Sequence, residues 1–460
     1  MLSEMALSQG VSRTSQKQLT VRSRSWTMRC VPLLWAVAFL LSKPAGAAYS
    51  PQAMVHKSLP KITETKFVSS QEFEFKPAEN VEEPRSIWDS LTFGMISKLW
   101  REDQHTDEPV YDLALIVSKN LIIKEDNRPT FSQHASTIVE IAPGEMLAAW
   151  FGGSWEKNPD VGIWMSRYKD GEWSDTPWEV VKPVDAVPTW NPVLFKVPAT
   201  GEVLLFYKVG EDPEVWEGRM IRSKDNGHSW GPTEQLPSGM YGPVKNKPIV
   251  LKDGTILAGG SDEVNWTVHV EYSRDNGYTW HRTSAIPFAG KILQPAMYVD
   301  GSGRARMLCR SNNDRLNKRY VNNNVVLIQG DRSGLKWSKG VRTNAPNPNA
   351  GLDAVRLRDG RLLMVYNPNN DGAQRARATL AIAVSRDEGH SWRLAGQLER
   401  VDVAPRPYTW PEYSYPAVIQ AEDGKVHITY TYTYEVQRRG LEGRENIMHA
   451  VVDVLDLERQ

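Results

Sequence analysis

Three eight-residue stretches of this chain share one pattern, Ser-x-Asp-x-Gly-x-Ser/Thr-Trp. They are Ser223–Trp230, Ser273–Trp280 and Ser385–Trp392. Aspartate accepts hydrogen bonds from backbone N–H groups one or two residues further on, and glycine adopts a positive φ without steric cost. Each stretch follows an apolar run that is typical of a strand. The pattern therefore predicts a tight turn that closes a β-hairpin and returns its Trp to the core. We call these stretches the eight-residue turns.

A longer repeat surrounds these turns. Six segments share an extended apolar run that begins with a polar or small residue: His134–Val139, Asn191–Phe195, Asn246–Val250, Gln294–Met297, Gly351–Val355 and Tyr413–Val418. Most are followed by a glycine-containing turn and a second apolar strand. Roughly 45 to 65 residues separate one copy from the next, which is the length of a four-stranded propeller blade. The sequence therefore predicts an all-β fold, a six-bladed β-propeller of four-stranded antiparallel blades.

Within a blade we name the strands A to D from the axis outward. The six segments above are the A strands, and the C strands run into the eight-residue turns. The predicted B strands include Leu362–Tyr366 and Val426–Tyr432, and Thr379–Ser385 is a predicted C strand. The last blade has A, B and C strands before the chain ends. Its outer strand is expected from upstream, at Asn120–Lys124, which would close the ring and remove a bare sheet edge.

Residues 1–47 have the organisation of a signal peptide. Glu4 is the only acid in a Ser- and Arg-rich lead, Val31–Leu41 is apolar, and small residues follow, which predicts cleavage after Ala47. An uncleaved signal anchor and an organelle transit segment stay open as alternatives. We expect the chain in the secretory pathway, secreted or lumenal, or else membrane-anchored or targeted to an organelle.

Residues 48–107 are polar, contain several prolines and show no clean hydrophobic period, so we expect an irregular extension. One stretch in it, Ile87–Trp100, has apolar residues at helical spacing and predicts an amphipathic helix. The propeller is then expected to occupy residues 108–460.

Composition excludes several classes of partner and cofactor. Lys and Arg total 55 and Asp and Glu total 55, so no basic surface points to nucleic acid. A membrane is expected as a partner only if the N-terminal segment stays as an anchor. The two cysteines are Cys30 and Cys309, and Cys30 lies in the segment expected to be removed, which leaves no intramolecular disulfide. No metal-ligand spacing stands out, and we expect no cofactor.

Antiparallel order fixes which residues meet. The starts of the A strands, the ends of the B strands and the starts of the C strands lie on one face of the disc, and the eight-residue turns lie on the other. The candidate residues on the first face are His134, Asn191, Lys247, Gln294 and Tyr413 at A-strand starts, Asp160 in the first B–C loop, Arg310 ending the fourth B strand, and Arg377 opening the fifth C strand. Several cations, an acid and a tyrosine around an axial funnel predict a site for a small, anionic, polar ligand.

The eight-residue turns resemble the Asp-box of sialidases and related propellers. Residues 128–456 resemble the sialidase superfamily, in particular its Asp-box (BNR) sialidase-like branch, through phrases such as His134–Ile138, Ala149–Gly153 and Asn246–Ile249. The resemblance implies a site in which three arginines hold the substrate carboxylate, a tyrosine activated by a glutamate is the nucleophile, and an aspartate is the acid/base. Tyrosine suits this role because the anomeric carbon already carries a carboxylate, which would repel a carboxylate nucleophile.

Matched to that pattern, Arg310 and Arg377 fall at the second and third arginines, with Arg375 as the reserve for the third. Tyr413 falls at the nucleophile and Asp160 at the acid/base, for which Glu156 competes. Structural explanations stay open for His134, Lys247, Tyr413 and Asp160.

Two positions depart from the pattern. His134 stands in place of the first arginine, and Gln294 stands in place of the glutamate. Glutamine is neutral and cannot accept a proton from a phenol of ordinary pKa near 10.

Three functions therefore stay open. The leading hypothesis is an exo-acting, sialidase-like glycoside hydrolase that removes a terminal acidic sugar from glycans. The second is a uronate-directed polysaccharide lyase or hydrolase on the same fold, with His134 or Tyr413 as the base. The third is a non-catalytic carbohydrate-binding propeller, which Gln294 favours, since propellers host unrelated functions. In each case we expect an acidic glycan or oligosaccharide as the partner.

Overall fold

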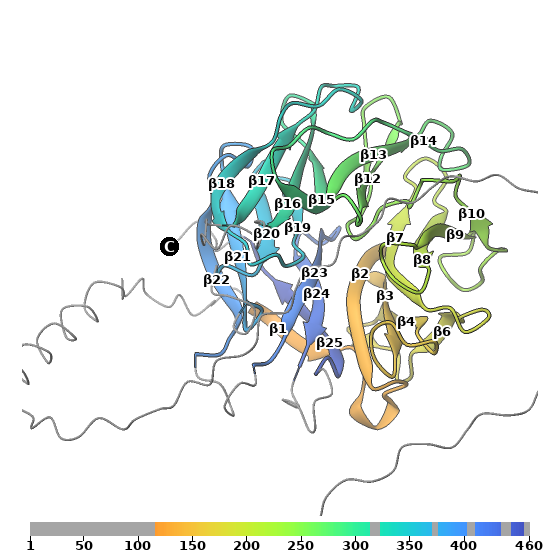
Figure 1. Ribbon diagram of the computed structural model, residues 1–460. Coiled ribbons are helices and arrows are strands. Elements are labelled where there is room, and N and C mark those ends of the chain that lie inside the picture. The colour runs from red at the N-terminus through yellow and green to blue at the C-terminus, as the bar shows by residue number, and fades with distance from the viewer. Residues whose placement is uncertain (1–115, 313–322, 370–375, 403–409, 434–442, 455–460) are drawn as a thin grey trace, which may run out of the picture. The chain divides into compact units, whose positions relative to one another are not determined.

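The computed structural model describes residues 116–312, 323–369, 376–402, 410–433 and 443–454. In these residues the strands form six separate antiparallel sheets arranged around a common axis (Figure 1). The prediction of an all-β, six-bladed propeller of four-stranded blades is confirmed, with one additional short strand in the first sheet, where both β5 and β6 pair with β4. The expectations for residues 1–47 and 48–107, for a helix at Ile87–Trp100 and for Arg375 lie outside the described residues.

The first three sheets follow one another along the chain. The first contains β2 (Ser132–Ala142), β3 (Glu145–Gly153), β4 (Gly162–Lys169), β5 (Glu172–Trp173) and β6 (Trp178–Val181). The second contains β7 (Thr189–Lys196), β8 (Val203–Val209), β9 (Glu217–Ser223) and β10 (Glu234–Gln235). The third contains β11 (Ile249–Val250), β12 (Ile256–Asp262), β13 (Thr267–Ser273) and β14 (His281–Arg282).

The other three sheets complete the set. The fourth contains β15 (Lys291–Val299), β16 (Ala305–Asn312), β17 (Asn324–Gln329) and β18 (Val341–Pro346). The fifth contains β19 (Asp353–Arg356), β20 (Leu362–Tyr366), β21 (Thr379–Ser385) and β22 (Arg393–Arg400). The sixth contains β23 (Tyr413–Gln420), β24 (Val426–Tyr432), β25 (Asn446–Val452) and β1 (Ile116–Leu121). One short 3₁₀ helix, Glu125–Asn127, follows β1.

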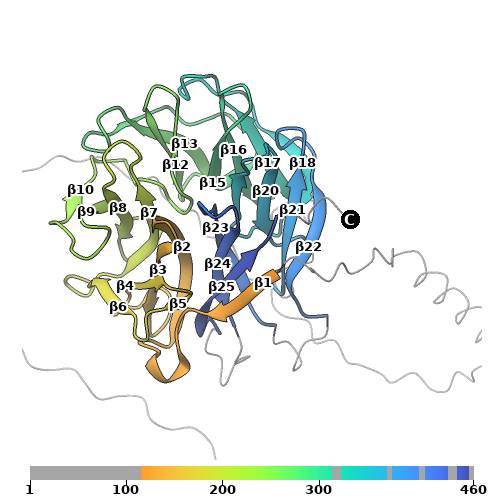
Figure 2. The same ribbon diagram turned by 180° about the vertical axis from the view of Figure 1, so that it is seen from behind.

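The outer strand of the sixth sheet comes from the beginning of the described chain. Strand β1 pairs antiparallel with β25, with Asn120 opposite His449, and Figure 2 shows the two strands side by side. The paired strand is Ile116–Leu121, which begins upstream of the expected Asn120–Lys124. The Ile122 N–H continues the pairing by donating to the carbonyl oxygen of Ile447.

The inner strand of the third sheet is shorter than expected. Only Ile249–Val250 pairs with β12, although the apolar pattern predicted a strand over Asn246–Val250. Pro248 has no N–H to donate to a ladder, so the pairing begins only after it. The side chains of Lys245 and Asn246, just before this strand, are buried at the axial end of the blade.

The core lies between adjacent sheets. In one cluster, Leu363 and Ile382 of the fifth sheet pack with Val418 and Ile428 of the sixth, and all four side chains are fully buried. These residues alternate along their strands with residues of the opposite face, as strand geometry requires. Each sheet therefore buries both faces against its neighbours.

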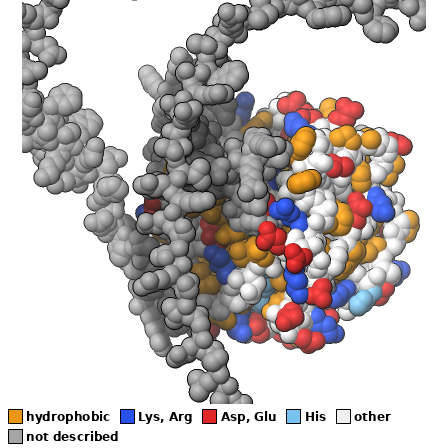
Figure 3. All heavy atoms as spheres, turned by 90° about the horizontal axis from the view of Figure 1, so that it is seen from below, with side chains coloured by type: hydrophobic (Ala, Val, Ile, Leu, Met, Phe, Trp, Pro, Cys, Tyr) orange, Lys and Arg blue, Asp and Glu red, His pale blue; other side chains and the backbone are white. Residues whose placement is uncertain are grey.

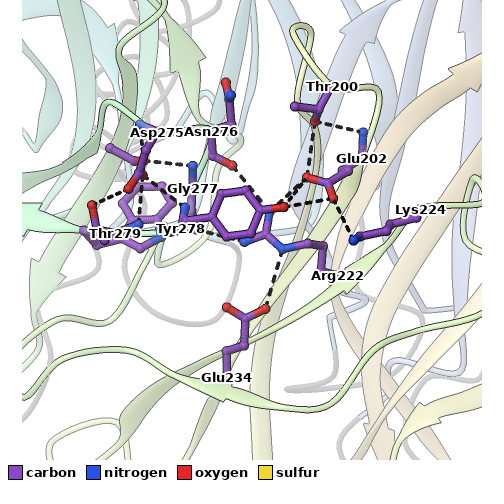
Figure 4. Close-up of polar contacts among 12 residues, drawn as sticks. Thr200, Glu202, Arg222, Lys224, Glu234, Asp275, Asn276, Gly277, Tyr278 and Thr279 are labelled. Carbon is purple, nitrogen blue, oxygen red and sulfur yellow. Dashed lines mark hydrogen bonds and ion pairs between the residues drawn. The ribbon is translucent and has the colours of Figure 1, made fainter.

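The eight-residue turns connect neighbouring blades. In the third sheet, Asp275 accepts hydrogen bonds from the backbone N–H and the hydroxyl of Thr279, at 2.8 and 2.6 Å. Gly277 has a φ of 86°, and a Cβ there would lie 2.9 Å from Leu204 of the second sheet. The Tyr278 hydroxyl donates to Glu202, and the Arg222 guanidinium lies 4.0 Å from the Tyr278 ring centroid, both in the second blade (Figure 4). The repeated geometry of the turn thus serves packing between blades.

Acidic and basic side chains are interspersed on the surface that Figure 3 draws, with no broad patch of one sign. This agrees with the formal net charge of zero. Among the described residues, no helix is long and apolar enough to cross a membrane.

Candidate functional site

A repeated bulge shapes the axial ends of four inner strands. The ladders of β2, β7, β15 and β23 with their partners each shift register near the strand start. At each bulge a non-glycine residue has a positive φ, and these residues are Ala135, Asn191, Gln294 and Tyr415. A positive φ is uncommon outside glycine, and such strain collects at functional sites. The side chains at these four bulges are therefore candidates for a functional role.

Two of these bulge residues meet at the axis. The Gln294 amide nitrogen lies 3.4 Å from the Tyr415 hydroxyl, and both side chains are buried. Gln294 is on β15 and Tyr415 on β23, which come from the fourth and sixth blades (Figure 1). The chain thus brings together two residues that are 121 positions apart.

Cationic side chains surround the ring of Tyr415. The guanidinium carbons of Arg310 and Arg377 lie 5.9 and 5.4 Å from the ring centroid, and the Lys245 ammonium lies 5.8 Å from it. The His134 ring centroid is 4.3 Å from that of Tyr415. Positive charge within about 6 Å of an aromatic face is attracted to its quadrupole. The predicted residues His134, Gln294, Arg310 and Arg377 therefore all lie around Tyr415.

Arg310 forms hydrogen bonds only to neutral groups within the described part of the chain. Its Nη1 donates to the Tyr415 hydroxyl at 2.8 Å and to the Gln294 amide oxygen at 2.9 Å, and its Nε donates to Asn349 at 2.9 Å. The residue is 7% exposed. A buried guanidinium ordinarily pairs with a carboxylate or another anion. Arg310 is thus suited to receive an anion from outside the chain.

Glu412 binds the other two arginines of the site. Its two carboxylate oxygens accept hydrogen bonds from Arg377 Nη1 at 2.6 Å and from Arg444 Nε at 2.9 Å, and the Ser414 hydroxyl donates to it at 2.5 Å. Burial favours the protonated form, but the charges of Arg444 and Arg377 outweigh it and hold the Glu412 pKa well below its usual range. Glu412 is therefore ionised at neutral pH.

His134 is neutral in this setting. Its Nδ1 is 2.8 Å from the hydroxyl of Thr431, and its Nε2 is 4.0 Å from a Glu412 oxygen. Burial, followed by the charge of Arg444, lowers the pKa of His134 well below its usual value. A neutral imidazole cannot replace the charge of an arginine at this position.

Lys245 lies beneath the tyrosine. Its ammonium donates to the Asn246 side chain at 2.8 Å, to the carbonyl oxygen of Leu352 at 3.2 Å and to the carbonyl oxygen of Pro416. Burial lowers the Lys245 pKa to about 7. The three acceptors come from three blades, so Lys245 fixes the strand starts around the axis.

Three predicted residues have other partners. Lys247 forms an ion pair with Asp353 at 2.8 Å and connects the third and fifth blades. Asn191 is buried, and its carbonyl oxygen accepts a hydrogen bond from Lys208. The carboxylate of Asp160 accepts hydrogen bonds from the backbone and hydroxyl of Ser154, within its own loop. None of these contacts places Lys247, Asn191 or Asp160 against Tyr415.

Tyr413 lies in the core between the fifth and sixth sheets. Its ring centroid is 5.1 Å from that of Tyr432, and it packs with Val418 and Leu380. Burial raises the pKa of its phenol. The hydroxyl that meets Arg310 belongs to Tyr415, two residues further along the same strand.

Three residues of the site, Tyr415, Glu412 and Arg444, were not among the predicted ones. A proline signal could have found the tyrosine, because Tyr415-Pro416 has the same form as Gln294-Pro295 and Asn191-Pro192. Arg444 stands two residues before β25, as Arg377 stands two residues before β21. No sequence pattern identifies Glu412. Among the described residues, no group of three or more His, Cys, Asp or Glu side chains could hold a metal ion.

Comparison with protein families decides where the chain belongs. A family model described as a BNR repeat-like domain matches residues 144–428. The chain belongs to the BNR repeat-like family. The matched residues run from the β2–β3 turn to β24 and so include most of the blades. A search of curated protein sequences found no match to this BNR repeat-like chain.

Solved structures share the fold of this BNR repeat-like protein at low sequence identity. The NanB sialidase from Streptococcus pneumoniae is similar with a TM-score of 0.57 and 12% identity, over 73% of this chain and 71% of that protein. A leech intramolecular trans-sialidase gives 0.56 and 11%, over 75% and 71%. A protein of unknown function from Dyadobacter fermentans gives 0.56 and 15%, over 74% and 98%. At these identities the likeness establishes the sialidase fold and no more.

Proposed function

We propose that this chain is an exo-acting, sialidase-like glycoside hydrolase that removes a terminal acidic sugar from glycans. The observation that carries the proposal is the buried Arg310 guanidinium, which binds no carboxylate in the described chain and donates to the Tyr415 hydroxyl at 2.8 Å. A sugar that carries its carboxylate on the anomeric carbon, as sialic acid does, would place that carbon beside the Tyr415 hydroxyl when the carboxylate binds Arg310. The glycan-processing relatives that share the fold support this choice of substrate class.

In the proposed reaction, Tyr415 is the nucleophile. Its oxygen forms a bond to the anomeric carbon as the glycosidic C–O bond breaks, and water then releases the sugar from the tyrosine. The His134 imidazole, whose ring centroid is 4.3 Å from that of Tyr415, is the proposed acceptor of the phenol proton, because Gln294 cannot serve. The Glu412 carboxylate, 4.0 Å from His134 Nε2, would stabilise the imidazolium that burial disfavours. We propose Asp160, on the β3–β4 loop, as the acid that protonates the leaving oxygen.

A second candidate function is binding of an acidic glycan without turnover. Gln294 supplies no base, and both hydrogen bonds of the Asp160 carboxylate hold its own loop. In that case the arginines would bind the sugar carboxylate and Tyr415 would contribute only its ring and hydroxyl to recognition.

A substrate panel with paired tyrosine variants separates these functions. Fluorogenic sialosides and glycans ending in uronic acids are offered to the purified protein. Release of free sialic acid supports the hydrolase, an unsaturated uronate absorbing in the ultraviolet indicates a lyase, and binding alone indicates a lectin-like protein.

The tyrosine variants test which hydroxyl acts. We expect Tyr415→Phe to lower turnover at least a hundredfold with binding retained, because the nucleophile is removed. Tyr413→Phe, the matched control on the same strand, is expected to keep activity. Loss of turnover in Tyr413→Phe with full activity in Tyr415→Phe would show that the assignment is wrong.

A further inference from the structure

A cavity of about 390 Å³ lies between the first and sixth blades, on the same face as the eight-residue turns. It is bordered by the β2–β3 turn at Gly144, the β4–β5 turn at Asp170 and the β23–β24 turn at Asp423. In Figure 2 the hairpin of β2 and β3 lies beside the blade that β1, β23, β24 and β25 form. These turns are at the opposite ends of the strands from Tyr415. The cavity is therefore separate from the axial site, and its volume is in the range of small-ligand sites.

The side chain of His427, on β24, lines this cavity and has an unpartnered ring nitrogen. The residue is 4% exposed, and its Nε2 has no hydrogen-bond partner among the described residues. Its Nδ1 is 3.0 Å from His449 Nε2, so the Nε2 edge of the ring is the one left for a ligand. A buried polar atom without a partner is rare in folded proteins and points to a missing one.

The free nitrogen of His427 is a hydrogen-bond donor. Burial lowers the pKa of His427 to about 4 and that of His449 to about 3, so both rings are neutral at neutral pH. Trp173 Nε1, which can only donate, is 3.1 Å from His449 Nδ1, and the proton of His449 is therefore on Nε2. His449 donates it to His427 Nδ1, which leaves the proton of His427 on Nε2. The missing partner is thus an acceptor.

Carboxylates outnumber cations around the cavity. The charged residues that line it are Glu140, Glu145, Asp170, Asp423 and Lys425. Lys425 is 3.3 Å from Asp423, and Lys169, outside the lining, is 2.5 Å from Glu145. Glu140 and Asp170 form no ion pair with another described residue, so the lining has an excess of negative charge. Such a lining repels an anion, in contrast with the axial site.

A hydroxyl group satisfies both requirements of this lining. It accepts a hydrogen bond from His427 Nε2 and donates one to a carboxylate, whereas an ammonium group offers the histidine no acceptor. In the part of the chain that the structure describes, no three His, Cys, Asp or Glu side chains are grouped to hold a metal ion. The Tyr168 ring, in the same lining, adds an aromatic surface of the kind that ligand pockets combine with a few polar groups.

We propose that this cavity binds a neutral sugar residue of a glycan, held by His427 Nε2 and by the carboxylates of Glu140 and Asp170. It is a second carbohydrate site, distinct from the axial site in position and in charge. The inference goes beyond the proposed function and does not depend on turnover at Tyr415.

Saturation-transfer NMR titrations of the full chain test this site. Galactose, N-acetylglucosamine and lactose are the neutral probes, and putrescine is the cationic one. The proteins are the wild type, His427→Phe, Asp170→Asn, Arg310→Ala and a control, His390→Phe. His390 is in the eight-residue turn of the fifth blade, on the same face but outside the cavity. Melting curves identify the variants that are folded.

We expect at least one neutral sugar to bind the wild type, with a Kd about three- to tenfold higher in His427→Phe, because one neutral hydrogen bond is lost. Asp170→Asn should raise the Kd about tenfold, because a charged acceptor is lost. Asparagine tolerates the φ of 53° at this position, so this variant serves as the test if His427→Phe does not fold. His390→Phe and Arg310→Ala should bind the sugar as the wild type does.

Three results would overturn the proposal. The first is that none of the neutral sugars binds the wild type, or that putrescine binds in their place. The second is an unchanged Kd in the folded His427 and Asp170 variants. The third is a sugar whose binding is lost in Arg310→Ala and kept in His427→Phe, which would place it at the axial site. None of these results bears on hydrolysis of an acidic sugar, so failure of this site and failure of the proposed function are distinguishable.

Discussion

The amide of Gln294 decides how much of the Arg310 charge is available to a ligand. Its oxygen accepts a hydrogen bond from Arg310 at 2.9 Å, and its nitrogen faces the Tyr415 hydroxyl. A carboxylate at this position would neutralise the guanidinium, whereas the neutral amide leaves its charge uncompensated. The amide that cannot act as a base therefore favours anion binding.

Gln294→Glu tests this balance. We expect the affinity for an acidic monosaccharide to fall about tenfold, because the introduced carboxylate competes for Arg310. Any turnover per bound substrate should rise, because that carboxylate would accept the phenol proton. Titration and initial rates measure the two effects separately. Asn191→Asp, at the equivalent bulge of the second blade, is the control and should change neither; undiminished affinity in Gln294→Glu would contradict the account.

Lys208 gives the protein a pH-dependent stability. Burial lowers its pKa to about 7 in the folded protein, and the charges of Glu271 and Glu263 only partly oppose this. The unfolded chain has the ordinary value of 10.5 and so binds more protons between these values. Stability therefore rises with pH from about 7 upward, since unfolding takes up a proton there.

We expect Lys208→Met to lose the part of this dependence that Lys208 contributes, whereas Lys245, whose pKa burial also lowers to about 7, keeps its own part. From pH 7 to pH 9, the gain in the free energy of unfolding should be smaller by about 2 kcal/mol than in the wild type. Urea unfolding at each pH measures it. The exposed Lys252→Met is the control and should keep the wild-type slope; an unchanged slope in Lys208→Met would show that Lys208 is charged when buried.

At the scale of the strand, the bulges explain which parts of the site were predictable. Apolar runs and glycine turns located β20, β21 and β24 at their observed bounds, because strand ladders follow local pattern. The tyrosine was not located, because both Tyr413 and Tyr415 fit the start of β23. The register shift between Ser414 and Ala417 determines which face of the sheet each tyrosine side chain occupies, because a bulge changes the alternation of side chains along a strand. As a result, Tyr415 and not Tyr413 faces the axis.

The ion pairs of Glu412 with two arginines could not be predicted from the sequence for a different reason. Its partners, Arg377 and Arg444, are 35 and 32 residues away and belong to two blades. Charged residues near strand ends are common, and only the closure of the ring determines which of them meet. Arg310 and Gln294 were identified because they mark a strand end and a residue before proline.

The eight-residue turns are expected to contribute stability and not activity. In Asp275→Ala, the acceptor for the Thr279 N–H and hydroxyl is lost, and the free energy of unfolding should fall by about 1–3 kcal/mol, at the lower end because the turn is partly solvated. Chemical unfolding measures this change. The neighbouring exposed Arg274→Ala is the control; a loss of ligand binding in folded Asp275→Ala would contradict the separation of turn and site.

For the molecule as a whole, the propeller separates two tasks. The turns between C and D strands fasten neighbouring blades at one face, as the contacts of Tyr278 with Glu202 and Arg222 show. The strand ends and starts at the other face bring Arg310 of the fourth blade and Arg377 of the fifth to Tyr415 and Glu412 of the sixth. On the surface that Figure 3 draws, acidic and basic side chains are interspersed.

The most direct test is a crystal structure of the protein with a bound acidic monosaccharide such as N-acetylneuraminic acid. The account predicts the sugar at the axial face, its carboxylate within hydrogen-bond distance of Arg310 and its anomeric carbon about 3 to 3.5 Å from the Tyr415 hydroxyl. A sugar bound at the turn face, or at the axis with its carboxylate directed away from Arg310, would contradict it.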